Sequence, residues 1–96
     1  GRNIHAVTNG VHSRTWTGDS FKALYDRHIP GWGNDPSALR SAVGIAREEI
    51  WEAHAEAKDR LVAEVVRRTG TGLERSAFTI GFGRRATTYK RADLLF

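Results

Sequence analysis

One long segment repeats apolar residues at every third or fourth position. Between positions 46 and 68 this stripe has eight members: Ile50, Trp51, His54, Ala57, Leu61, Val62, Val65 and Val66. The period predicts an amphipathic helix with one buried face, about 35 Å long at about 1.5 Å per residue. Glu48 and Glu49 fall in its first turn, where acidic side chains suit the helix dipole, and Gly70 supplies a stop. His54 lies on the stripe, so we expect it to be packed there.

Shorter helical segments precede the long one, each marked by a capping residue. Ser13 can cap a helical turn, and Asp19 or Ser20 can cap a short helix whose apolar residues follow at helical spacing. Asp35 can cap another short helix over 36–42, which opens on a proline at its favoured first position. The chain is therefore expected to be mostly helical, with three or four helices around the long one.

The remaining segments alternate or are rich in turn residues. Residues 4–7 predict a short strand that enters a turn at Asn9-Gly10, a pair in which both residues tolerate positive φ. Residues 78–82 predict a second strand, and Trp32, in a loop dense in Pro and Gly, is expected to anchor packing. Because one strand cannot make a sheet, both runs would need neighbouring strands from outside this chain.

The composition indicates one domain or less of an ordinary globular protein. The chain has 96 residues, and 15 Lys and Arg against 11 Asp and Glu give a net charge of +4. It has no cysteine, no apolar run of transmembrane length and no signal-peptide pattern, so we expect a cytoplasmic protein. The absence of Met, the opening Gly1 and the apolar end at Leu95-Phe96 favour a piece of a longer protein.

One basic cluster stands out from an otherwise scattered set of cations. It comprises Arg84, Arg85, Lys90 and Arg91, directly after the predicted strand at 78–82. A strand that ends in a short loop and restarts as a helix presents backbone N–H groups and a positive helix end, which bind anions. The cluster is thus a candidate site for phosphate or another compact dianion. A solvated basic face, or a loose surface for nucleic acid and other polyanions, remains the alternative.

Other chemistry has weak signals. The amide of Asn9 could hydrogen-bond a ligand hydroxyl, although the pattern alone favours a purely structural turn for the Asn-Gly pair. No metal site is expected, because the histidines lack ligand-like spacing and there is no cysteine. Gly81-Phe82-Gly83 is followed by no third glycine, so it is not a dinucleotide-binding fingerprint, and no P-loop or nucleophile elbow occurs.

Two separated motifs, in order, resemble those of one enzyme family. Residues 7–12, Val-Thr-Asn-Gly-Val-His, with Trp16 after them, resemble the T-N-G-(I/V)…W segment of the α-glucan (glycogen, starch, maltodextrin) phosphorylases. Residues 79–92 resemble that family's R-x-x-x-Y-K-R segment in its bacterial form, with Arg85, Tyr89, Lys90 and Arg91 at the fixed positions. The resemblance covers essentially the whole chain. Gly83 and Ala86 depart from the more usual residues, at positions outside the matched contacts.

The resemblance implies an α/β fragment of a GT-B-like fold, in which two Rossmann-like domains face each other across a cleft. The chain would comprise a crossover segment with a sugar-site loop (1–18), a helical segment (19–70) and a strand-loop-helix with the phosphate site (77–96), at the start of the C-terminal domain. Family enzymes are glycosyltransferases that move the terminal glucosyl unit of an α-1,4-glucan to inorganic phosphate, giving α-glucose 1-phosphate. They use pyridoxal phosphate.

Site residues follow from the same resemblance, position by position. Arg85 falls on the arginine that binds the substrate phosphate, and Lys90 on the lysine that contacts the cofactor phosphate. Tyr89 and Asn9 match residues that contact the glucosyl unit, and Arg84 adds to the positive field. The family's Schiff-base lysine has no counterpart here, so Lys90 is not that residue and this chain alone is expected to be inactive. The sequence says nothing of chain-length preference, regulation or oligomeric state.

Overall fold

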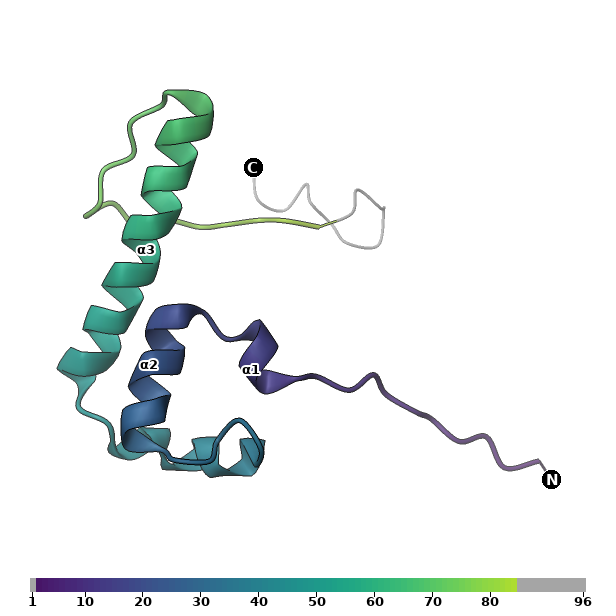
Figure 1. Ribbon diagram of the computed structural model, residues 1–96. Helices are drawn as coiled ribbons and strands as arrows, with labels where there is room; N and C mark the ends of the chain where they lie inside the picture. The colour runs from purple at the N-terminus through teal and green to yellow at the C-terminus, as the bar shows by residue number, and fades with distance from the viewer. Residues whose placement is uncertain (1, 85–96) are drawn as a thin grey trace.

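The computed structural model describes residues 2–84 and is built from one long helix and shorter helices near its N-terminal half (Figure 1). The elements are α1 (Ser13–Trp16), α2 (Asp19–His28), the 3₁₀-helix η1 (Pro36–Gly44) and α3 (Arg47–Thr69). The expectation of a mostly helical chain is confirmed. We call α2, the loop after it, η1 and the first half of α3 the helical core, and residues 2–12 and 71–84 the two terminal segments.

The two strand predictions are wrong within the described residues. Neither residues 4–7 nor residues 78–82 form a strand, and both lie exposed on the terminal segments. A strand is defined by hydrogen bonds to a neighbour, and an alternating sequence cannot supply that neighbour by itself. The α/β part of the predicted fold class is therefore not seen in residues 2–84.

Two of the predicted helix ends are confirmed, and two predicted N-caps are wrong by one or two residues. Asp35 caps η1 as expected, since its carboxylate accepts a 3.0 Å hydrogen bond from the Ser37 amide. Gly70 ends α3 with φ of 68°, a left-handed conformation that glycine adopts without strain. The cap of α2 is Gly18 rather than Asp19 or Ser20, because the Asp19 carboxylate turns to Lys22 and Arg60 instead. Helix α1 is likewise capped one residue before the predicted Ser13.

The core is small and is made by α2, its following loop and the start of α3. Buried side chains come from each of these parts: Leu24, Ile29, Trp32, Ile45 and Ala53. Trp32 is 1% exposed and meets the Tyr25 ring edge-on at 5.4 Å, which confirms it as a packing anchor. Figure 1 shows α2 lying against the first half of α3.

Two ion pairs and one histidine–carboxylate contact hold α2 and α3 antiparallel. Arg27 and His28, at the end of α2, both contact the Glu49 carboxylate near the start of α3, at 3.2 and 2.8 Å. At the other end, Asp19 contacts Arg60 at 3.2 Å. Each pair is exposed and contributes little energy alone, but together they fix the register of the two helices.

The buried face of α3 is only partly the predicted one, because Ile50 packs against the core as expected. His54 is exposed, and Trp51 is 71% exposed, while Ala53 is the α3 residue that enters the core. The reason is the side on which α2 docks: the core forms on the side of α3 that carries Ile50 and Ala53, and the side with Trp51 and His54 is left uncovered. Trp51 and His54 stack on each other instead, with ring centroids 5.5 Å apart.

Candidate functional site

The first terminal segment carries Asn9 on extended, exposed chain. Residues 2–12 have no regular secondary structure, and a side chain added at Gly10 would meet nothing within 4 Å. This segment is joined to the rest of the chain by α1, whose first turn is capped by His12. The His12 Nδ1 atom accepts a 3.2 Å hydrogen bond from the Thr15 amide. Asn9 therefore stands three residues before the first fixed point of the fold.

A cluster of three side chains fixes α1 to the helical core. Arg14 makes a two-pronged ion pair with Asp26 on α2, at 2.8 and 3.0 Å. The buried Trp32 donates its Nε1–H to the same carboxylate at 2.9 Å, and the Arg14 guanidinium lies 5.4 Å from the Trp32 ring centroid. The Arg14 side chain also lies against Gly33, where an added Cβ would be 3.4 Å from its Cδ. We call Arg14, Asp26 and Trp32 the α1 clamp.

Electrostatics in the clamp follow from these contacts. The hydrogen bonds from Arg14 and then from Trp32 stabilise the ionised carboxylate, and they lower the pKa of Asp26 from 3.8 to about 2. The same carboxylate raises the pKa of Arg14. The pair is therefore fully charged at neutral pH.

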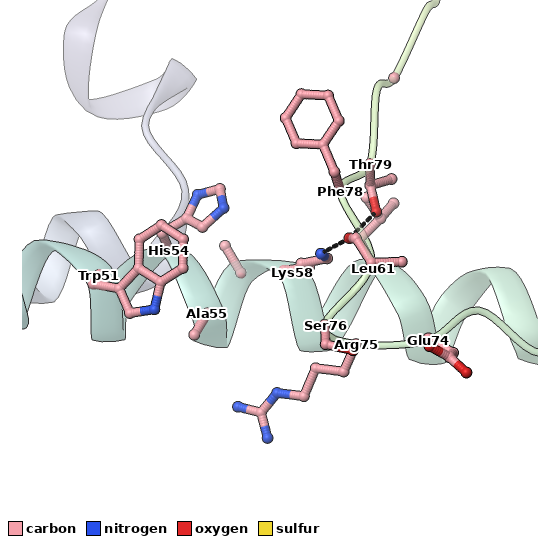
Figure 2. A pocket seen from close by; sticks show the side chains of 13 residues that line it. Trp51, His54, Ala55, Lys58, Leu61, Glu74, Arg75, Ser76, Phe78 and Thr79 are labelled. Carbon is pink, nitrogen blue, oxygen red and sulfur yellow. Dashed lines mark hydrogen bonds between the residues drawn. The ribbon is translucent and has the colours of Figure 1, made fainter.

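The second terminal segment turns back along α3 and forms a groove with it. The groove is lined on one side by α3 residues that include Trp51, His54 and Leu61, and on the other by Phe78 and Thr79 (Figure 2). Lys58 donates to the Ala77 carbonyl, and Arg75 pairs with Asp59 at 2.6 Å, so two polar contacts hold the segment on the helix. These contacts are local, and of the predicted site residues that the structure describes, neither Asn9 nor Arg84 lines the groove.

The predicted phosphate site lies mostly outside the described residues. Arg84 is exposed at the end of the second terminal segment, and open space surrounds the positions of Gly81 and Gly83. Arg85, Tyr89 and Lys90 are outside residues 2–84, so their roles stay predictions. Figure 1 shows the segments that carry Asn9 and Arg84 leaving the helices as two separate stretches. The described residues do not bring the two halves of the site together.

Comparison with known proteins finds relatives that align with nearly all of this chain. The maltodextrin phosphorylase of Thermococcus litoralis is 36% identical to this chain over a gapped alignment of 108 positions, which covers 96% of this chain and 13% of the relative. The glycogen phosphorylase of Aquifex aeolicus is 33% identical over a gapped alignment of 115 positions, which covers 97% of this chain and 16% of the relative. The chain is homologous to a segment of the glycogen and maltodextrin phosphorylases. The resemblance found in the two motifs is thereby confirmed.

The homology is broad along this chain and narrow along its relatives. The glycogen phosphorylase of Mycobacterium tuberculosis is also similar, at 29% identity over 96% of this chain and 13% of the relative. No protein-family model and no solved structure matches. Since the chain spans only 13–16% of the first two relatives, their activity as whole enzymes belongs to the proposal below.

Two other site classes find no support in residues 2–84. This part of the chain has no cluster of three or more His, Cys, Asp or Glu that could hold a metal ion. It also has no helix that is long and apolar enough to cross a membrane.

The α1 clamp was missed by the sequence reasoning. Arg14 and Asp26 are 12 positions apart and lie on different elements, so no helical or strand period links them. Trp32 was expected to pack in the core, but the sequence did not indicate that its indole N–H would donate to Asp26. One signal was available: a buried indole N–H needs a hydrogen-bond acceptor within reach, so the expected burial of Trp32 implied such a partner without naming it.

Proposed function

We propose that this chain forms part of an α-1,4-glucan phosphorylase, in which it supplies one side of the sugar and phosphate site. The observation that carries the proposal is the homology over 96% of the chain, which includes both motifs in their order. In the proposal, the enzyme transfers a terminal glucosyl unit to inorganic phosphate and gives α-glucose 1-phosphate. The domain assignment of residues 1–18, 19–70 and 77–96, the GT-B architecture and a cytoplasmic location belong to the same proposal.

The proposed roles fit the chemistry of the side chains. Arg85 would bind the substrate phosphate, because a planar guanidinium forms two parallel hydrogen bonds to a phosphate. Lys90 would contact the cofactor phosphate as a compact point charge, and Arg84 would add to the field. Two phosphates repel each other at short range, so holding both close together requires several fixed cations. Asn9 and Tyr89 would hydrogen-bond the glucosyl hydroxyls.

Pyridoxal phosphate is expected in the parent enzyme, and the described residues do not hold its aldehyde. The chain has three lysines. Lys22 binds the Asp19 carboxylate at 3.2 Å, and Lys58 donates to the Ala77 carbonyl. Lys90 is assigned to the cofactor phosphate. We therefore assign the Schiff base to a lysine in another part of the parent polypeptide.

Phosphorolysis by the full-length polypeptide that contains this sequence tests the proposal. With pyridoxal phosphate present, it should release glucose 1-phosphate from maltoheptaose and phosphate. Arg85→Ala and Lys90→Ala should each lower kcat/KM by about 100-fold or more, the scale of losing an electrostatic contact in an active site. Arg40→Ala is the matched control, because Arg40 is an exposed arginine of η1 outside both motifs, and it should leave the rate unchanged.

The outcomes separate the competing functions. No phosphate-dependent release from the cofactor-loaded protein would refute the phosphorylase assignment. Full activity in both variants would keep the family and refute the site assignment. Binding of any polyanion with a steep salt dependence, and with Arg84, Arg85, Lys90 and Arg91 interchangeable, would instead support the basic-module alternative.

A further inference from the structure

Helix α1 is too short to hold its own place. It has four residues, and a single helical turn is unstable in isolation because nucleation fixes several residues for one hydrogen bond. No side chain of α1 is buried. Among the ion pairs of residues 2–84, Arg14–Asp26 is the one that joins α1 to another element. The position of α1 therefore depends on the α1 clamp.

The clamp limits where Asn9 can be. Three peptide steps separate Asn9 from His12, the capping residue of α1, and an extended chain covers at most about 3.6 Å per residue. Asn9 thus stays within about 11 Å of His12, wherever the clamp holds α1. By fixing α1, the helical core can therefore restrict the position of Asn9.

We propose that Asp26 is a positioning residue for Asn9, which acts by holding α1 through Arg14 and Trp32. The inference rests on the proposed function, since it needs Asn9 to contact the glucosyl unit. The geometry suits the role: a two-pronged contact fixes the orientation of a guanidinium, and the Trp32 N–H fixes the carboxylate from the buried side. Trp32 is itself 1% exposed, so the clamp is anchored in the core.

A second arginine–carboxylate pair supplies the matched control. Arg67 also makes a two-pronged contact, with Glu64, at 2.8 and 2.7 Å, and both side chains are partly exposed, as they are in the clamp. Both partners lie on α3, three positions apart, so this pair joins no two elements. A purely electrostatic effect on stability should appear in both pairs, whereas positioning of Asn9 should appear in the clamp alone.

The test is a double-mutant cycle in the full-length polypeptide loaded with pyridoxal phosphate. Asn9→Ala and Asp26→Asn should each lower kcat/KM for maltoheptaose about tenfold, and the double variant should also lose about tenfold rather than about 100-fold. The KM for phosphate should stay within about twofold in Asp26→Asn, because the sugar contact alone is disturbed. Glu64→Gln should stay within about twofold of the wild type in every constant.

Each outcome decides the proposal. Independent losses that multiply in the double variant, or an unchanged Asp26→Asn, would overturn it while phosphorolysis by the wild type upholds the proposed function. An inactive wild type would overturn both. If Asp26→Asn fails to load the cofactor, Arg14→Lys replaces it in the cycle, since lysine keeps the charge and loses the two-pronged contact. Arg14→Lys should then show the same non-additivity with Asn9→Ala, and additivity there would equally overturn the proposal.

Discussion

The helical core and the terminal segments differ in what surrounds their apolar side chains. In the helical core Leu24 and Trp32 are each 1% exposed. In the terminal segments Ile4 is 97%, Val7 94% and Phe78 90% exposed. Yet the terminal segments carry residues 7–12 of the first motif and the start of the second, by which the chain resembles the phosphorylases. The described residues that carry the resemblance to an enzyme family are therefore the ones with the least packing around them.

The contrast also shows that residue type does not decide burial. Trp32 and Trp51 have the same side chain, but one is enclosed by α2, the loop and η1, and the other lies on the side of α3 that α2 does not reach. Burial depends on the element that covers a position, and that element is set by packing between helices rather than by local sequence.

The largest expected effect on stability comes from replacing Trp32 by alanine, with the same replacement at Trp51 as its comparison. Trp32→Ala should lower the free energy of unfolding by about 3–5 kcal/mol, because it removes the centre of a small core, and the cooperative thermal transition should disappear. Trp51→Ala should change stability by about 0.5 kcal/mol or less. Thermal unfolding followed by circular dichroism measures both. Equal effects at the two positions would contradict the division into core and exposed face.

A smaller effect is expected at Gly70, where α3 passes into the second terminal segment. The residue has φ of 68°, and Gly70→Ala should lower the free energy of unfolding by about 1 kcal/mol because alanine is strained there. Gly72→Ala is the control, since Gly72 has no such conformation and open space around it. Denaturant unfolding curves compare the two. A Gly70→Ala protein as stable as Gly72→Ala would show that α3 does not end at this point.

The smallest effect concerns pH and the α1 clamp. Folding lowers the pKa of Asp26 to about 2 from its ordinary 3.8, so its contribution to stability is complete above about pH 4 and is lost as pH falls toward about 2. Asp26→Asn should lack this part of the acid sensitivity. Thermal midpoints between pH 5 and pH 2 should therefore fall more steeply in the wild type than in the variant. Parallel curves would contradict the ion pair.

The sequence predicts well those features that neighbouring residues determine. The Asp35 cap lies one residue before Pro36, and the Gly70 stop directly follows the last turn of α3. The long helix itself, expected over 46–68, spans Arg47–Thr69. Each depends on hydrogen bonds or dihedral angles within a few positions, which a local pattern specifies.

Features that depend on distant partners were not predictable in the same way. Which face of α3 is buried depends on where α2 docks, so His54 was assigned wrongly. The alternating runs at 4–7 and 78–82 specify strands only if a neighbour exists. For the candidate site, Asn9 and the basic cluster are predicted from motifs and stay predictions, and the Arg14–Asp26 pair was not predicted, because no motif or period joins its two residues.

Amide hydrogen exchange of this chain, read by mass spectrometry, tests the division between helical core and terminal segments most directly. Peptides from 20–28 and from 50–58 should be protected, because their amides lie in packed helices. Peptides from 2–11 and 78–84 should exchange at the rate of an open chain. Protection at 4–7 or 78–82 equal to that of α2 would show that these segments are paired in this chain, and would contradict the account.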